Sequence, residues 1–235
     1  CNITFVGSAA DDSSISATVT SGSALAAIGL SVQCQKVTSD ALKIHNTTVT
    51  FAGFASYGSA ISAMVSGYTS ATVGLALSSG TSAAVIAADS TLIFLGSATN
   101  SSNISATAGT SAAATVGMSL WINSISTMSI TGSNVTFVGT AATNSTITAT
   151  CNRQAAAALG LALLSGSTIF TTTGSNITFL ASAATDSTIS AAATSSAAAA
   201  IGMAFVCGGD STITVASSDV SLLGAAGNTS TISAT

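Results

Sequence analysis

Residues 134–150 read NVTFVGTAATNSTITAT, and the way this segment recurs along the chain predicts the fold. Its two apolar anchors, Phe137 and Ile147, return at intervals of 42 to 46 residues. The first anchor position holds Phe5, Phe51, Phe94, Phe137, Phe179 and Leu222. The second holds Ile15, Ile61, Ile104, Ile147, Ile189 and Ile232. A fixed period of this length is the signature of a repeat architecture.

The second half of each repeat has an anchor of its own, a glycine within an alanine-rich stretch. In both halves apolar residues alternate with small polar ones, as Val135 and Phe137 do with Asn134 and Thr136. Period 2 is the pattern of β-strands. The chain is therefore interpreted as one solenoid domain over residues 1–235. Its repeats are placed at about 1–45, 46–88, 89–131, 132–173 and 174–217, with a partial repeat at 218–235.

Among the architectures with such repeats, the residue types favour a β-helix. Gly, Ser, Thr and β-branched residues disfavour a helical solenoid, and the chain shows neither a propeller-blade signature nor a six-residue rhythm. We therefore predict an all-β, parallel, right-handed β-helix with about 21 residues per coil, two coils per repeat and about eleven coils. The strand pattern at 2–4 and at 231–235 predicts a solenoid without caps, and open strands invite pairing with further strands.

The chain of 235 residues carries few charges, with three Lys or Arg, seven Asp or Glu and a net charge of −4. Three cations cannot neutralise a phosphate backbone, so no nucleic-acid partner is expected. The mean hydropathy of +0.70 raises the question of a membrane. The longest apolar runs, 155–164 and 197–207, stop well short of the roughly 20 residues of a spanning helix, so no transmembrane segment is predicted.

Asparagine provides one way to keep an uncharged surface in water. Eight of the ten asparagines lie in Asn-X-Ser/Thr sequons, namely Asn2, Asn46, Asn100, Asn103, Asn134, Asn144, Asn176 and Asn228. Outward sequons of an extracellular protein accept N-linked glycans. We therefore expect an extracellular or cell-surface glycoprotein with no other cofactor. The alternative, that these asparagines cap turns or form an amide ladder, stays open.

Two outward strips are expected if the apolar columns point inward. The glycine half would expose a smooth strip of small residues, at Ala27, Gly29, Gly74, Gly117, Gly160 and Gly202. Such a strip suits lateral docking of another solenoid, although tight coils also tolerate small residues there. The other half would expose hydroxyl ladders, as at Thr146 and Thr148, interrupted by Ala60, Asn103 and Met64.

Residues for catalysis or metal binding are sparse. Asp11 and Asp12 are interpreted as a solvated turn rather than a calcium site, and His45, the only histidine, has no partners for a triad or a metal cluster. The four cysteines lie too far apart in the predicted coils for disulfides. The architecture resembles pectate-lyase-like β-helices, whose enzymes cluster Asp with Arg or Lys on one face. No such cluster is present, so we expect neither an enzyme nor a metal site.

The repeats resemble those of extracellular parallel β-helix proteins of the fibril and surface-adhesin type. The resemblance implies a structural protein whose main partner is itself, assembled into a fibre or surface layer by end-to-end and lateral contacts. Ladders such as Thr146-Ile147-Thr148 are also similar to the arrays of β-helical ice-binding proteins. An ice-binding or polysaccharide-binding solenoid is therefore the alternative.

Overall fold

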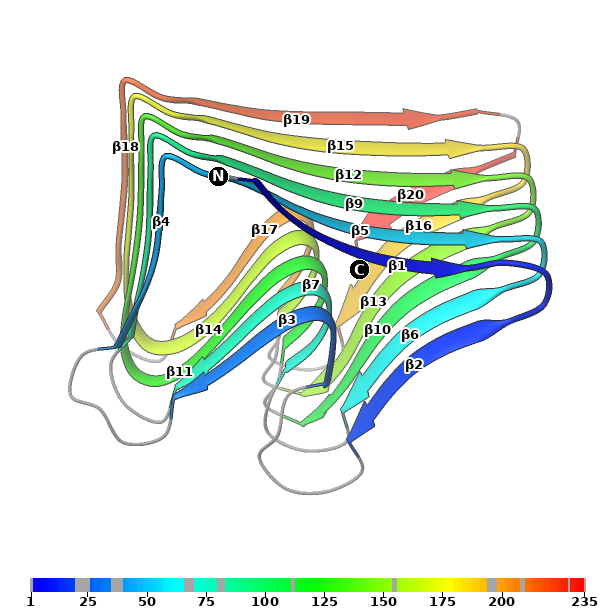
Figure 1. Ribbon diagram of the computed structural model, residues 1–235, viewed down its shortest axis with the longest axis horizontal. Coiled ribbons are helices and arrows are strands. Elements are labelled where there is room, and N and C mark those ends of the chain that lie inside the picture. The colour runs from blue at the N-terminus through cyan, green and yellow to red at the C-terminus, as the bar shows by residue number, and fades with distance from the viewer. Residues whose placement is uncertain are drawn as a thin grey trace.

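The computed structural model describes residues 2–19, 26–34, 40–65, 70–79, 83–110, 113–153, 156–193, 198–207, 210–227 and 229–234. The regular secondary structure in these residues is β throughout, in parallel strands stacked in register (Figure 1). This confirms the predicted parallel β-solenoid. Its handedness stays a prediction.

Two six-stranded sheets follow one another around the coil (Figure 1). Sheet 1 contains β1 (Asn2–Ala9), β5 (Thr48–Ser56), β9 (Thr91–Thr99), β12 (Asn134–Ala142), β15 (Asn176–Ala184) and β19 (Asp219–Ala226). Sheet 2 contains β2 (Ser14–Val19), β6 (Ala60–Val65), β10 (Asn103–Thr110), β13 (Thr146–Arg153), β16 (Thr188–Ala193) and β20 (Thr231–Ala234). Both follow the repeat, since each strand pairs with its equivalent one repeat away.

Sheet 3 is formed by the glycine half of each repeat. Its main strands are β3 (Ala26–Cys34), β7 (Ser70–Ser79), β11 (Ala113–Thr131), β14 (Ala156–Thr173) and β17 (Ala198–Cys207). The shorter β4 (Asp40–His45), β8 (Ala83–Ala88) and β18 (Thr212–Ala216) align with the second parts of β11 and β14. Figure 1 shows β4 and β18 on the side of the coil that leads back to sheet 1.

One coil spans one whole repeat, which corrects the predicted coil length. Phe94 is registered with Phe51 on one side and Phe137 on the other, so the chain advances one strand spacing per repeat of about 43 residues. The described chain therefore makes five coils and the first part of a sixth, not eleven coils of about 21 residues. Alternation alone could not distinguish the two arrangements, because both halves of a repeat are strands. They lie on opposite sides of one coil instead of stacking on each other.

Figure 1 shows that the main strands of sheet 3 bend sharply, with the apex of the bend toward sheet 1. The positive φ values of the anchor glycines account for this bend. Gly74, Gly117 and Gly160 have φ values of +137°, +142° and +140°, respectively, which L-residues rarely adopt. A Cβ at Gly117 would collide with the carbonyl of Gly160 and lie 3.0 Å from Cδ1 of Phe137. The column is glycine because the bend requires this φ and because the next coil occupies the side-chain position.

The glycine bend divides the interior into two cores. Val73, before the bend, packs with Ile61 in the core under sheet 2. Leu75, after the bend, packs with Phe94 in the core on the other side. In that second core the phenylalanine rings stack along the axis, with centroids 4.8 to 5.1 Å apart and planes within 10°. Aromatic burial of this kind is a large source of stability.

Buried serines hold two corners of the coil together. At the corner before sheet 1, the Ser90 amide donates to Oγ of Ser133, 3.0 Å away, and the Ser133 amide donates to Oγ of Ser175, 3.2 Å away. Ser133 Oγ in turn donates to the carbonyl of Thr131, at 2.8 Å. The corner before sheet 2 repeats the pattern, for example from the Ser102 amide to Ser145 Oγ. These hydroxyls satisfy backbone groups that the turns would otherwise leave unpaired inside the protein. Ser59, in the same column as Ser102, is an exception, because its buried Oγ has no hydrogen-bond partner among the described residues.

The described residues contain no helix long and apolar enough to cross a membrane.

Candidate functional site

The outer face of sheet 2 presents an unbroken ladder of hydroxyls. Its middle position, here called the hydroxyl column, holds Ser16, Ser62, Ser105, Thr148, Ser190 and Ser233. These side chains are partly or fully exposed, while their neighbours Ile61 and Ala63 are buried. The flanking positions are interrupted at Ala60, Asn103 and Met64, as the sequence predicts. The hydroxyl column itself has no interruption.

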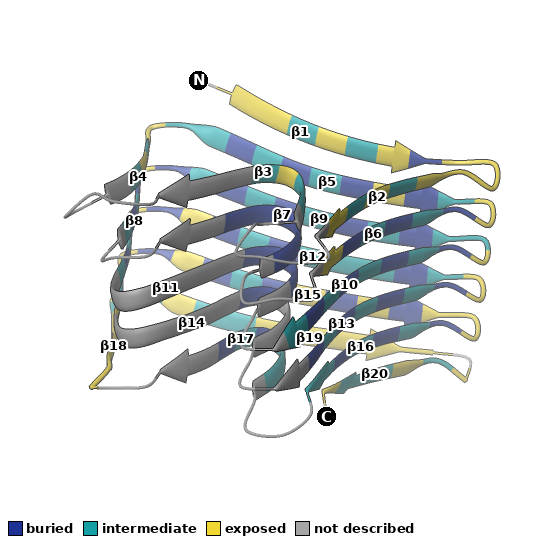
Figure 2. Ribbon diagram, turned by 90° about the horizontal axis from the view of Figure 1, so that it is seen from below, coloured by how far each residue is buried: buried dark blue, intermediate teal, exposed yellow. Residues whose placement is uncertain are grey.

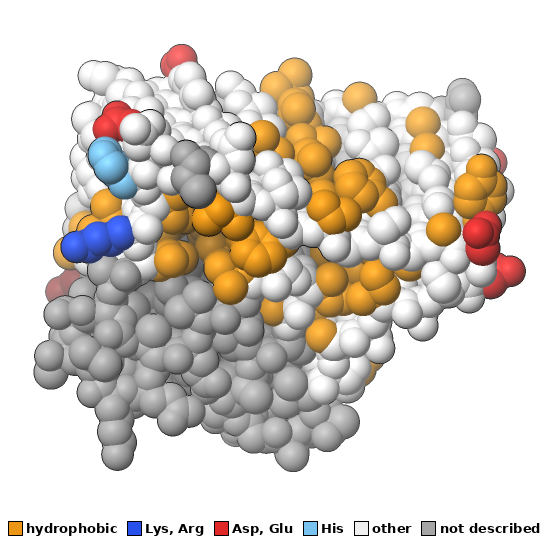
Figure 3. Space-filling view, in the orientation of Figure 1, with side chains coloured by type: hydrophobic (Ala, Val, Ile, Leu, Met, Phe, Trp, Pro, Cys, Tyr) orange, Lys and Arg blue, Asp and Glu red, His pale blue; other side chains and the backbone are white. Residues whose placement is uncertain are grey.

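The outer face of sheet 1 has an apolar column, which the sequence analysis did not identify. It consists of Val6, Ala52, Leu95, Val138, Leu180 and Leu223, one residue per coil in register. Val6, Leu180 and Leu223 are 61%, 37% and 57% exposed. Figure 3 shows hydrophobic side chains gathered in a band across this face. The signal was present in the sequence, because the residue after each first anchor is apolar where strict alternation requires a polar one.

The anchor glycines do not form the predicted lateral packing strip. Gly74, Gly117, Gly160 and Gly202 are buried at the bend of sheet 3, beside the side chains of the first-anchor residues. Only the first coil differs, with Ala27 half-buried and Gly29 exposed. The prediction of an outward docking surface at these glycines is therefore wrong. Their small size serves the close approach of successive coils.

Seven sequon asparagines lie within the described residues, in three kinds of position, while Asn228 lies outside them. Asn2, Asn134 and Asn176 are exposed at the first outward position of sheet 1. Nδ2 of Asn176 donates to Oδ1 of Asn134 at 3.0 Å, so part of the amide ladder that the sequence left open is present.

The other sequons lie at the corner before each sheet or within sheet 2. Asn46, Asn100 and Asn144 adopt left-handed φ values of 50°, 56° and 59° at the corners, a conformation that asparagine tolerates well. Asn103 is half-buried in β10, and its Oδ1 accepts a hydrogen bond of 2.9 Å from Oγ1 of Thr146. Turn formation and amide hydrogen bonds thus account for several sequon positions without sugar.

Asp11, Asp12, Asp89 and Asp186 lie at corners of the coil. His45 Nδ1 lies 4.0 Å from Asp89 Oδ2, and both side chains are largely exposed, so the pair contributes little stability. Asp11 and Asp12 form an exposed left-handed turn. Among the described residues no three His, Cys, Asp or Glu side chains come close enough to hold a metal ion.

The two end coils expose residues whose equivalents in inner coils are buried. Leu222 in β19 is 62% exposed, whereas Phe94 in the same column is 3% exposed. At the opposite end, Ile3 in β1 is 43% exposed. Figure 2 shows the same contrast, with mostly exposed and intermediate residues along β1 and β20 and buried ones in the coils between them.

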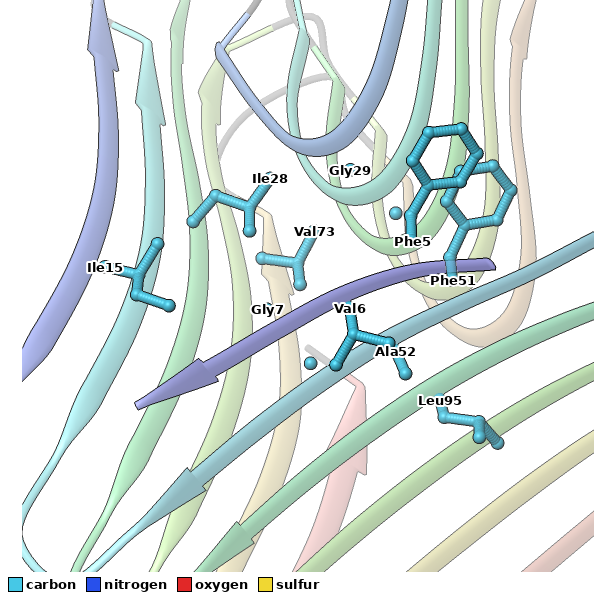
Figure 4. A pocket seen from close by; sticks show the side chains of 12 residues that line it. Phe5, Val6, Gly7, Ile15, Ile28, Gly29, Phe51, Ala52, Val73 and Leu95 are labelled. Atoms are coloured by element: carbon cyan, nitrogen blue, oxygen red, sulfur yellow. The ribbon is translucent and has the colours of Figure 1, made fainter. Parts of the chain in front are cut away.

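An apolar cavity opens at the first coil. It has a volume of about 280 Å³ and is lined by side chains that include Phe5, Ile15, Ile28 and Val73. Figure 4 shows that Phe5 lies on one side of Gly29, while Ile15 and Ile28 lie on the other. The cavity therefore joins the ends of the two cores and presents apolar surface without charge.

Comparisons with protein-family models, with curated proteins and with solved structures found no match.

Proposed function

We propose that this chain is a structural subunit of an extracellular fibre or surface layer, formed when successive copies stack end coil on end coil. The observation that supports the proposal is that successive coils are interchangeable, because each core column repeats the same residue types in register from coil to coil. Core residues at an open strand edge favour the addition of a further coil, because it buries apolar surface and pairs free backbone groups. No catalytic chemistry is part of this proposal.

The columns of the two ends match each other. If β1 of a second copy pairs with β19, Phe5 lies over Leu222, and Ile15 lies over Ile232. The same residue types already stack inside the chain, where Phe179 is registered with Leu222 and Ile189 with Ile232. The contact between copies would thus repeat the packing within one copy.

The two ends differ in one respect, because the last coil lacks a sheet 3 strand of its own among the described residues. β19 and β20 belong to the sixth repeat, while β17 and β18 belong to the fifth. With β1 of a second copy on β19, its β3 lies about 4.8 Å too far from β17 to pair with it. Copies of residues 1–235 would therefore be joined through sheets 1 and 2.

N-linked glycans at exposed corners of the coil would help to keep the surface of such a fibre in water. Asn46 and Asn144 are exposed and lie at corners, away from the strand edges that stack. Glycans there would add solubility to a chain with ten charged residues, three basic and seven acidic. Mass spectrometry of the secreted protein before and after treatment with a peptide N-glycosidase tests both sites.

Electron microscopy of the purified chain tests axial stacking. We expect filaments that rise about 29 Å per subunit, which is six strand spacings of about 4.8 Å. Leu222→Lys places a charge on the stacking surface and should abolish the filaments. Ser190→Lys, on the outer face of sheet 2, is the matched control and should leave them intact. Particles that remain single at all concentrations would contradict the proposal.

The unbroken hydroxyl column favours a second candidate function, binding of ice or of a polysaccharide by sheet 2. Regular hydroxyls about 4.8 Å apart offer repeated hydrogen bonds to a repetitive ligand. Thermal hysteresis of the chain in solution, lost in Ser105→Lys and retained in Val138→Lys, would support ice binding. Retention of the hysteresis in Ser105→Lys would contradict this assignment of the surface.

A further inference from the structure

The apolar column of sheet 1 lies on a surface suited to burial. Leu95 and Val138 stand in the middle of the column and are half-buried by their neighbours, while Leu180 is more exposed. Phe54, in the adjacent outward position, is 41% exposed and widens the apolar band. An exposed apolar patch that continues over six coils is unusual for a protein that stays alone in water.

The size of this face matches a protein interface. Sheet 1 has six strands, and β1 has eight residues. At about 4.8 Å per strand and 3.4 Å per residue, the face measures about 29 by 27 Å, or roughly 780 Å². A standard stable interface buries about 800 Å² on each partner. One such face is therefore large enough for a stable contact.

The charges of this face favour a second copy over other partners. Its outward positions are uncharged except for Asp219, at the edge. Two copies therefore meet without repulsion, whereas an acidic or basic partner would find almost nothing to pair with. The face also lacks the Lys, Arg and Trp that hold proteins at bilayer surfaces, and the net charge of −4 opposes anionic lipid.

We propose that two copies of this chain pack sheet 1 against sheet 1, with apolar column on apolar column. A twofold axis along the column makes the contact self-complementary. This axis places Val138 opposite Val138 of the second copy, and Leu180 opposite Leu180 of the second copy. Both copies have the same strand spacing, so the residues match at every coil. The role of this contact as a lateral contact between filaments rests on the proposed fibre. The pairing of two copies itself requires no axial stacking.

Light scattering coupled to size-exclusion chromatography, on the unglycosylated chain of residues 1–235, tests the pairing. At concentrations too low for filaments to form, we expect wild type at twice the mass of the chain. Val138→Lys/Leu180→Lys should raise the dissociation constant of the dimer by about 100-fold, because the double substitution places four ammonium groups in one apolar contact. Thr148→Lys/Ser190→Lys adds the same charge to the same coils on sheet 2, and it should dimerise as wild type does.

A second variant covers the case in which the lysines prevent folding, which circular dichroism would show. Val138→Thr/Leu180→Thr removes apolar surface without adding charge, and it should weaken the dimer by about tenfold. Dimers unaffected in both sheet 1 variants, or weakened equally by the sheet 2 control, would overturn the proposal. A monomeric wild type that binds uncharged phosphatidylcholine vesicles would also overturn it, in favour of a membrane.

Electron microscopy separates this proposal from axial stacking. Wild type should form paired filaments, and the sheet 1 lysine variant should form single ones. If no chain forms filaments but the dimer still depends on Val138 and Leu180, axial stacking fails and the lateral contact stands. Single filaments of wild type, together with a monomer in solution, would overturn the lateral contact alone.

Discussion

The ring of Phe137 lies parallel to that of Phe179, with centroids 4.9 Å apart and an angle of 3° between the planes. Both rings are almost fully buried, and the two residues are direct register partners in neighbouring coils. This stack passes beside the glycine bends of sheet 3, so it joins two parts of each repeat that are distant in sequence.

Phe137→Ala should therefore destabilise the fold by about 3 to 5 kcal/mol, because it removes a ring from the middle of the stack and leaves a cavity. Phe54→Ala removes the same ring from the outer face of sheet 1 and should cost less than about 1 kcal/mol. Thermal and urea unfolding of both variants measure the difference. Equal shifts would show that the stack contributes no more than a surface ring does.

Gly117→Ala should destabilise the fold by about 3 kcal/mol or more, because φ is +142° and the added Cβ meets the next coil. Gly139→Ala is the matched control. Its Cβ would lie 4.0 Å from the nearest atom, Cδ1 of Ile147, and the equivalent residue one coil later is Ala181. We expect less than about 1 kcal/mol there, by urea unfolding. A tolerated Gly117→Ala would refute the strained bend.

A chain shortened to residues 1–217 should stack more completely than the full chain. It retains five coils, and its two ends then match in all three sheets, because β3 of the next copy can pair with β17. The filament rise measured by electron microscopy should fall from about 29 Å to about 24 Å. Filaments of the full chain combined with none from the shortened chain would contradict the proposed stacking surface.

Glycans at Asn134 and Asn176 should oppose the lateral dimer. These residues lie on the same face as the apolar column, four residues or about 14 Å from it along each strand. Sheets pack about 10 Å apart, so a sugar there holds the two faces apart. In a glycosylating host, Asn134→Gln/Asn176→Gln should dimerise at least tenfold more tightly than wild type, and Asn46→Gln should not. Unchanged dimerisation with both sites occupied would contradict the shared-face arrangement.

The sequence was sufficient to predict a parallel β-solenoid, because Phe137 and Ile147 recur at one spacing and stand in register. It could not fix the coil length, since alternation is the same whether two halves of a repeat stack or face each other. The glycine column was misplaced for a related reason. Alternation assigned Gly117 to the outside, whereas its positive φ reverses the chain and turns that position inward.

The sequence analysis missed the apolar column because its residues directly follow core residues. Val138 and Leu180 follow buried phenylalanines, and two consecutive apolar residues suggest that both side chains are buried. The register shows that every coil carries one apolar residue at the same outward place, directly after the first anchor. The hydroxyl column, in contrast, was visible in the sequence because Ser and Thr there alternate with isoleucine and alanine.

The serine ladders give the solenoid a direction. In both ladders the amide of one coil donates to the hydroxyl of the following coil, as from Ser133 to Ser175 and from Ser145 to Ser187. Each coil in these ladders therefore donates toward the following coil and accepts from the preceding one, so the two directions along the solenoid axis differ. Fibres built from such coils would be polar, with unlike tips that elongate at unequal rates, and a blocker complementary to one tip would leave growth at the other unaffected.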